Sequence, residues 1–296
     1  MNKAPLKIID PHIHLFDLNK GKYDWLKPHN APLWPDKTNI NRDFNETNLH
    51  LGEAQELAGF VHIEAGFDNQ QPWREIDWLE QNCTLPFKSV AYADLCAETF
   101  NTHIQQLKQR ASVVGIRYIL DDDAYKVLSS NMTYKHLALL QQQNLSFDAQ
   151  LSLADDSGVG QLITIVKKLP LLKVIINHGG WPLDNFTPTA QRSWNANLIK
   201  LSQYDNVAIK LSGWEMSDRS WKLEQASNLL KDCLAVFGEQ RVMLASNFPL
   251  CTFSHSYKEL WGNYKLLLEG CELCPTNIIY NNALHWYQFD YLKVIS

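Results

Sequence analysis

The 296-residue sequence contains no long apolar run, no basic block and no regular cysteine framework. Its apolar stretches stay well short of the roughly 18 residues that a membrane-spanning helix needs. The opening segment Met1–Asp10 becomes polar too quickly for the apolar core of a signal peptide. We therefore expect a soluble, cytoplasmic protein that does not bind a membrane.

No part of the sequence concentrates charges of one sign. The 27 basic and 32 acidic residues give a formal net charge of −5 and are mixed along the chain. A nucleic-acid-binding surface requires clustered Lys and Arg. We expect no nucleic-acid partner; the sequence leaves a homo-oligomer open.

The six cysteines are scattered, and only Cys271 and Cys274 form a CxxC pair. A redox or zinc role for this pair requires a second pair or a thioredoxin-like context, and neither is visible. We interpret both residues as reduced thiols near a helix end.

What the sequence does contain is an ordinary globular composition, with 45% hydrophobic and 20% charged residues. Eight short apolar runs recur along it, and after the first they begin about every 25 to 35 residues, which is the length of one βα unit. The runs are Lys7–His14, Leu57–Glu64, Lys88–Leu95, Val113–Leu120, Leu145–Ser152, Lys173–Gly180, Asn206–Gly213 and Arg241–Pro249.

Stretches with helical periodicity lie between these runs. They include Trp73–Gln81, Thr133–Gln143, Val159–Leu169 and Trp221–Phe237, whose apolar residues fall on one stripe. Apolar strands that alternate with amphipathic helices indicate a parallel sheet covered by helices. Eight such units favour a closed α/β structure, a (β/α)8 TIM barrel, with one domain over residues 1–296.

The segment Phe16–Ala54 interrupts this rhythm and is rich in Asn, Pro, Trp and Lys. It follows the first strand, so on a barrel this long loop lies over the active-site end. Its aromatic residues argue against disorder. A lid that faces the substrate and a packed surface excursion both fit the sequence.

Barrel active sites lie at the carboxyl ends of the strands, so the last residues of each strand are informative. His12 and His14 are two apart and therefore point the same way on a strand. Imidazoles so placed are natural ligands for zinc or a similar ion, although a polar pair of purely structural role has the same spacing. His178 ends the sixth strand and is followed by glycines, which leave room above it.

Further polar groups end other strands. The second strand contributes His62 and Glu64, the fourth Arg117, the seventh Lys210 and the eighth Asn247. Charged side chains within apolar strands need a reason, because an unpaired buried charge is costly. Convergence on one cleft supplies that reason.

At this point the sequence resembles a known family. The segments IIDPHIHLFD, VHIEAG, GIRYIL, LSFDAQL, INHGGWP, VAIKLSGW, LASNFP and NALHWYQF are similar to motifs of the amidohydrolase-related family of barrel hydrolases, in family order from about Ile8 to Phe289. That family includes sugar lactonases and the pyrone-dicarboxylate lactonase. The resemblance implies a hydrolase that opens a small polar lactone or carboxylic ester.

Carried over by position, the resemblance implies that His12, His14 and His178 are metal ligands. It implies one divalent metal, zinc being the first choice, while metal-free action stays open because the related lactonases include a metal-independent member. The residue that closes strand eight is typically an aspartate in the family, and here it is Asn247.

An amide has no useful basicity near neutral pH, so Asn247 cannot deprotonate water. It is able to orient a water or a substrate carbonyl, or to coordinate weakly through its oxygen. Glu64 and Asp148 remain as carboxylates that could supply basicity, and Asp10 could buttress His12. We interpret the acidic run Asp121–Asp123 as a solvated turn before a helix.

Four other strand-end residues have a functional and a structural interpretation. Arg117 is predicted either to clamp a substrate carboxylate or to tie barrel loops together. Lys210 is predicted to act in catalysis or to pair with Glu64 or Asp148. Trp181 and Trp214 offer flat faces to a sugar-like ring or simply pack.

The prediction is therefore water attack on the carbonyl of a lactone, a small-molecule substrate, with a bound cation or Arg117 and His178 stabilising the oxyanion. Glu64, Arg117, Trp181 and Trp214 are the predicted substrate-binding residues. One alternative is a metal-dependent non-oxidative decarboxylase of the same superfamily. The other is a barrel that only binds a ligand, which Asn247 favours.

Overall fold

The computed structural model describes residues 4–182, 187–269 and 274–289. Eight parallel strands form one sheet in the sequence order β1 to β8, which confirms the predicted barrel. The strands are β1 (Leu6–Ile13), β2 (Gln55–Ile63), β3 (Phe87–Tyr92), β4 (Val113–Ile119), β5 (Ser146–Gln150), β6 (Val174–Ile176), β7 (Val207–Leu211) and β8 (Val242–Leu244).

The barrel closes between β1 and the residues that follow β8. The His14 N–H donates to the Phe248 carbonyl at 2.7 Å, and the Asn247 N–H donates to the His12 carbonyl at 3.0 Å. The buried Asp10 carboxylate accepts the backbone N–H groups of His12 and Ser246, each at 3.1 Å. Asp10 thus supports the His12 backbone, which is consistent with the buttressing predicted for it.

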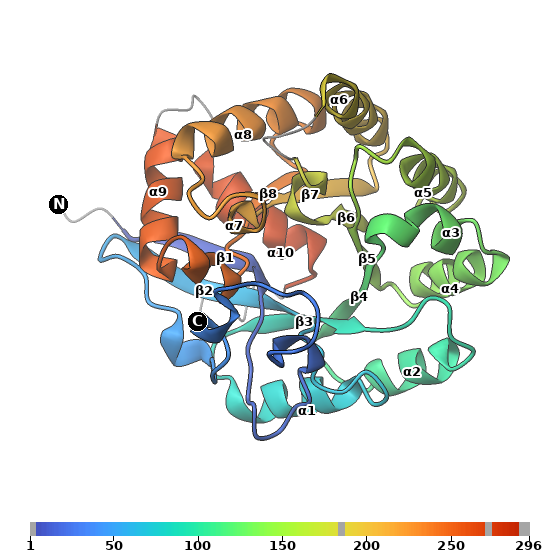
Figure 1. Cartoon of the computed structure of the whole chain (residues 1–296), viewed down its shortest axis with the longest axis horizontal. Helices are drawn as coiled ribbons and strands as arrows, with labels where there is room; N and C mark the ends of the chain where they lie inside the picture. Colours follow the sequence, from blue (N-terminus) through green and yellow to red (C-terminus); the bar gives the residue numbers. More distant parts are fainter. Residues whose placement is uncertain (1–3, 183–186, 270–273, 290–296) are drawn as a thin grey trace.

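Helices surround the strands in a ring (Figure 1). They are α1 (Trp73–Asn82), α2 (Phe100–Leu107), α3 (Ala124–Leu128), α4 (Asn131–Gln142), α5 (Asp156–Lys168), α6 (Pro188–Ser202), α7 (Trp214–Ser217), α8 (Leu223–Phe237), α9 (Tyr257–Glu269) and α10 (Asn282–Trp286). The four helices predicted from apolar periodicity correspond to α1, α4, α5 and α8. None of the helices in the described residues is long and apolar enough to cross a membrane.

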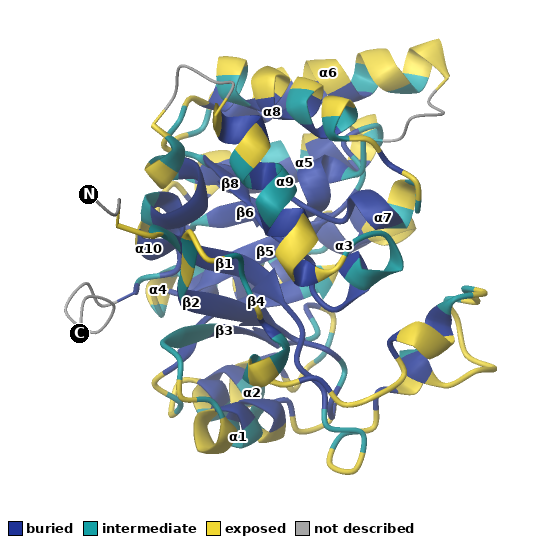
Figure 2. Cartoon of the chain, turned by 90° about the vertical axis from the view of Figure 1, so that its left-hand side faces the viewer, coloured by how far each residue is buried: buried dark blue, intermediate teal, exposed yellow. Residues whose placement is uncertain are grey.

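Burial follows the two layers of the barrel. Figure 2 shows the strands in the colour of buried residues and the helices with exposed outer faces. Helix α5 illustrates the pattern, because Val159, Leu162, Ile165 and Val166 are buried against the sheet while its Lys residues are exposed. A layered core of this kind fixes the strand ends in space, and with them the polar side chains that they carry.

The long segment after β1 is ordered by its own contacts. Phe16 and Phe44 form an antiparallel bridge with reciprocal backbone hydrogen bonds of 2.9 and 3.0 Å. Lys37 is buried and donates through Nζ to the carbonyls of Lys27 and Asn30, which cross-links the segment. The predicted absence of disorder here is confirmed.

The predicted turn at Asp121–Asp123 is a single 3₁₀ turn that leads into α3, as expected. Cys274 is exposed with a free thiol. Cys271 lies outside the described residues, so the interpretation of the pair as two reduced thiols stays a prediction.

Candidate active site

A cavity of about 720 Å³ opens at the carboxyl ends of the strands. Its floor is polar and includes His14, His178 and Asn247, and its walls combine aromatic side chains with aliphatic and polar ones. Trp25 and Trp34 of the segment after β1 are among these walls. The segment therefore forms part of the cavity wall, and its role as a lid that faces the substrate stays a prediction.

Three histidines gather beneath and beside this cavity. The Nε2 atoms of His12 and His14 lie 3.2 Å apart, and the His178 ring centroid lies 4.6 Å from that of His12. His12 is fully buried, and His14 and His178 are nearly so. The three imidazoles predicted to share one cleft do lie close together.

Hydrogen bonds at the far side of two rings fix their orientation. His14 Nδ1 lies 2.8 Å from the Ile63 carbonyl oxygen, which only accepts, so His14 carries its proton on Nδ1 and a lone pair on Nε2. His178 Nδ1 lies 3.0 Å from Ser212 Oγ. A Cβ atom on Gly213 would stand only 2.6 Å from His178 Nδ1, so a glycine is required beside this ring.

The residues partly fit a metal ion. Two imidazoles that bind one zinc ion at roughly 2.0–2.1 Å in tetrahedral geometry have nitrogens about 3.3 Å apart, close to the His12–His14 separation of 3.2 Å. His12 Nδ1 is buried without a hydrogen-bond partner in the described structure. Within the described ranges, however, no group of three or more His, Cys, Asp or Glu side chains is arranged to hold a metal ion.

All three imidazoles are held in the neutral form. Burial lowers the pKa of His12, His14 and His178 well below the usual value, and nearby cations lower it further. Among the nearby cations, Lys210 lowers the pKa of His12 and His178 most, and Arg117 lowers the pKa of His14 most. Neutral imidazole is the form that ligates a cation or accepts a proton.

Lys210 lies below the cavity and is fully buried. Its Nζ is 2.6 Å from Asp148 Oδ2 and 3.2 Å from the Pro11 carbonyl, and Tyr287 Oη donates to the same carboxylate oxygen at 2.9 Å. Of the two partners predicted for Lys210, Asp148 is the one that the structure shows. Neither Lys210 nor Asp148 lines the cavity, so the pair does not reach the substrate side of the site.

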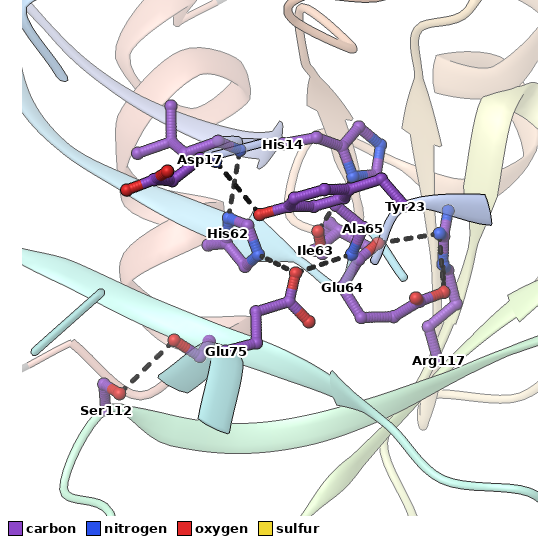
Figure 3. A network of polar contacts seen from close by, with 12 residues as sticks. His14, Asp17, Tyr23, His62, Ile63, Glu64, Ala65, Glu75, Ser112 and Arg117 are labelled. Atoms are coloured by element: carbon purple, nitrogen blue, oxygen red, sulfur yellow. Dashed lines mark hydrogen bonds and ion pairs between the residues drawn. The ribbon is translucent and has the colours of Figure 1, made fainter. Parts of the chain in front are cut away.

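Arg117 lines the cavity, but its guanidinium is already occupied. Nε donates to Glu64 Oε1 at 2.8 Å, and Nη2 donates to the Glu64 carbonyl at 2.9 Å (Figure 3). Nη1 donates to Gln150 Oε1 at 3.3 Å. The two charged side chains are only 8% and 7% exposed. Arg117 thus ties β4 to the end of β2, the structural alternative predicted for it.

His62 and Glu64 are two apart in sequence but make contacts in different places. His62 Nε2 lies 3.1 Å from Glu75 Oε1 on α1, and Glu75 also accepts the Ala65 N–H at 2.9 Å (Figure 3). Glu64 instead lines the cavity beside Arg117. His62 belongs to the contact between strand and helix.

The two predicted aromatic platforms are also placed differently. Trp181 lines the cavity, stacks on His178 with ring centroids 4.6 Å apart, and donates through Nε1 to Asp121 Oδ1 at 3.3 Å. Trp214 lines a smaller neighbouring cavity of about 240 Å³, and its Nε1 donates to Tyr264 Oη at 2.6 Å. The sequence prediction therefore fits Trp181 better than Trp214.

Asn247 has a partner that the sequence analysis missed. Its Nδ2 donates to Glu215 Oε1 at 2.6 Å, and both residues are buried. Burial raises the pKa of Glu215 to about 7. The one available signal was a carboxylate four residues after the last residue of β7.

The backbone of the site lies in unusual conformations. His178, Trp181 and Asn247 have φ values of 53°, 53° and 60°, in the left-handed region that non-glycine residues rarely adopt. Such strain persists only where the surroundings enforce it, and it concentrates at functional sites. The geometry therefore marks the same strand ends as the polar side chains do.

The fold and this site define a (β/α)8-barrel protein with its chemistry at the strand carboxyl ends. The amidohydrolase family profile matches residues 9–286, so the chain belongs to the amidohydrolase family.

Two curated relatives are similar over most of their length. An uncharacterized protein of Sinorhizobium fredii, y4mH, is 29% identical over 96% of this chain and 99% of its own. An L-fucono-1,5-lactonase of Burkholderia multivorans is 25% identical over 85% of each chain.

Solved structures share the fold. A Burkholderia multivorans amidohydrolase with bound zinc superposes with a TM-score of 0.78 at 21% identity, covering 96% of this chain and 99% of that one. A 2,6-dihydroxybenzoate decarboxylase has a TM-score of 0.62 at 12% identity, covering 97% of this chain and all of its own. Together the family match and the lactonase relative support a hydrolase of the amidohydrolase family.

Proposed function

We propose that this protein hydrolyses the ester bond of a small, uncharged, polar lactone. The observation that carries the proposal is the gathering of neutral imidazoles and one oriented amide, Asn247, at the floor of a cavity of about 720 Å³. This volume is typical of small-ligand sites. The similarity to a fuconolactonase supports the same reaction class.

The charges that line the cavity favour a neutral substrate. Glu64 and Asp121 bring two carboxylates to the lining, and Arg117 brings a guanidinium that is already paired with Glu64. A substrate carboxylate would have to compete with Glu64 for that guanidinium. A neutral sugar lactone meets no such competition, and its C–H faces suit the aromatic side chains of Trp25 and Trp181.

His12 and His14 are the residues that would hold a divalent cation, with His178 as the nearest third imidazole. When bound, such an ion would polarise the lactone carbonyl as a Lewis acid. The zinc ion in the related amidohydrolase supports zinc as the first candidate.

The protein's own residues would position the reactants. Asn247 would accept a hydrogen bond through Oδ1 from the attacking water, since its Nδ2 is held by Glu215. The water oxygen bonds to the carbonyl carbon, the ring C–O bond breaks, one proton of the water passes to the ring oxygen, and the other stays on the new carboxyl group. The hydroxy acid produced ionises above its pKa and releases one proton per turnover.

Proton release measured in a pH-stat tests this proposal. We expect the purified protein to open L-fucono-1,5-lactone faster than 2-pyrone-4,6-dicarboxylate, assayed with and without added zinc. Carbon dioxide release from 2,6-dihydroxybenzoate without proton release from any lactone would replace the proposal with decarboxylation. Faster opening of 2-pyrone-4,6-dicarboxylate would overturn the proposal that the substrate is uncharged.

A further inference from the structure

Asn247 is the only described residue of the loop after β8 that joins the polar floor of the cavity, and it is fixed at three points. Its backbone N–H donates to the His12 carbonyl at 3.0 Å, its φ of 60° holds a left-handed turn, and its Nδ2 donates to Glu215 Oε1 at 2.6 Å. Asn247 lines the cavity, while Glu215 lies behind it on the single turn of α7 and is only 1% exposed.

An amide side chain carries its donors on one atom and its acceptor on the other. Above its pKa of about 7, Glu215 is ionised and only accepts, so it selects the Asn247 orientation in which Nδ2 faces Glu215. Oδ1 is then directed away from Glu215 and is left to accept from a donor in the cavity. A glutamine or an apolar residue at position 215 would not impose this choice.

We propose that Glu215 is a positioning residue that sets the orientation of the Asn247 amide, so that its Oδ1 accepts a hydrogen bond from the attacking water or a substrate hydroxyl. This inference rests on the proposed lactone hydrolysis, since it assigns the role of Oδ1 in that reaction. Glu215 acts through Asn247 and does not touch the substrate.

Fold stability does not account for a carboxylate at this place. Burial raises the pKa of Glu215 to about 7, which means that its charge is unfavourable in the folded protein. Arg219 pairs with Asp36 and donates to the Glu215 backbone carbonyl, and its charge only partly offsets the effect of burial on the Glu215 carboxylate. The other titratable groups that face Glu215 are the Cys251 thiol and the Tyr264 phenol, and neither of them brings a positive charge.

The pair suggests an exchange experiment. Four proteins are compared: the wild type, Glu215→Gln, Asn247→Asp, and the double variant Glu215→Gln/Asn247→Asp. The single Asn247→Asp variant sets two carboxyl groups at hydrogen-bonding distance, whereas the double variant restores one amide and one carboxylate in the reverse order. Glu224→Gln on α8, an exposed position, removes a carboxylate elsewhere and serves as the control.

For L-fucono-1,5-lactone we expect Glu215→Gln to lower kcat about tenfold with KM within about twofold of the wild type, because only an orienting contact is lost. The melting temperature at pH 8 should not fall, because a buried charge is removed. Asn247→Asp should lower both kcat and melting temperature. The double variant should recover kcat to more than that of either single variant, while Glu224→Gln stays at the wild-type values.

An unchanged kcat in Glu215→Gln, or a double variant no more active than the better single variant, would overturn the proposal. A melting-temperature loss without any change in kcat would make Glu215 a structural residue only. If the wild type opens no lactone, the proposed function fails separately. In that case the melting temperatures of the four proteins alone test whether Glu215 and Asn247 are coupled. If the effects of the two substitutions on melting temperature are additive, the proposed coupling is overturned.

Discussion

Removal of the Arg117 guanidinium is expected to destabilise the fold more than it weakens substrate binding. Arg117 and Glu64 are paired with their side chains only 8% and 7% exposed, and the shortest separation is 2.6 Å. Arg117→Ala leaves the Glu64 carboxylate buried without its partner. Breaking a buried pair in this way costs roughly 3–5 kcal/mol.

For 296 residues with an unfolding entropy of roughly 2.1 cal/mol/K per residue, 3–5 kcal/mol corresponds to a loss of about 5–8 °C in melting temperature. Thermal unfolding of Arg117→Ala at pH 7.5 measures it directly. The double variant Glu64→Gln/Arg117→Met removes both charges at similar volume and should recover most of the loss.

A loss below about 2 °C in Arg117→Ala would refute this reasoning, as would a double variant no more stable than the single one. The same protein tests the carboxylate clamp predicted from the sequence. If Arg117 binds substrate charge, KM for an anionic lactone rises while KM for a neutral lactone stays constant. We expect no such selective rise.

Three further predictions concern pH, metal and the segment over the cavity. Glu215 has its pKa raised from 4.5 to about 7 in the folded protein, so its contribution to stability is full below pH 4.5 and is lost as the pH rises through 7. The unfolding free energy of the wild type relative to Glu215→Gln should therefore fall by on the order of 3 kcal/mol between pH 4.5 and 8, and a constant difference in denaturant titrations would contradict this. His14→Ala should retain less zinc than His50→Ala, an exposed control, when both are analysed for metal after dialysis; equal content would exclude His14 as a ligand. Asp36→Asn removes the carboxylate bonded to Arg219 at 2.8 Å and should raise KM a few-fold at constant kcat, so an unchanged KM would argue against a substrate-facing role of this segment.

The strands were predictable because a parallel barrel buries both faces of each strand. Continuous apolar runs such as Lys173–Gly180 therefore stand out without any alignment, and β6 lies within that run. His12 and His14 followed from the two-residue period of a strand, and the structure brings their Nε2 atoms within 3.2 Å. Local periodicity was enough for these features.

The pairing of charges was not predictable in the same way. Glu64 and Arg117 are 53 residues apart, and Asp148 and Lys210 are 62 apart, so only the closed barrel decides which partners meet. The sequence left Lys210 with two partners for this reason. Spacing also suggested a common location for His62 and Glu64, but Glu75 on α1 holds His62 elsewhere.

Glu215 escaped the sequence analysis because α7 has only four residues. A single helical turn has no apolar stripe to detect. Its neighbour Trp214 was singled out instead, and the structure turns that side chain toward Tyr264. The role of Asn247 is therefore visible only once α7 is placed against the loop after β8.

The central claim is that the imidazoles and the amide at the floor of the cavity open a neutral lactone. The most direct measurement is the rate of proton release from L-fucono-1,5-lactone by the wild type, His178→Ala and the exposed control His50→Ala. The account predicts measurable turnover by the wild type and by His50→Ala, and a loss of about a hundredfold or more in kcat for His178→Ala. Equal rates in all three proteins, or no turnover by any of them, would contradict it.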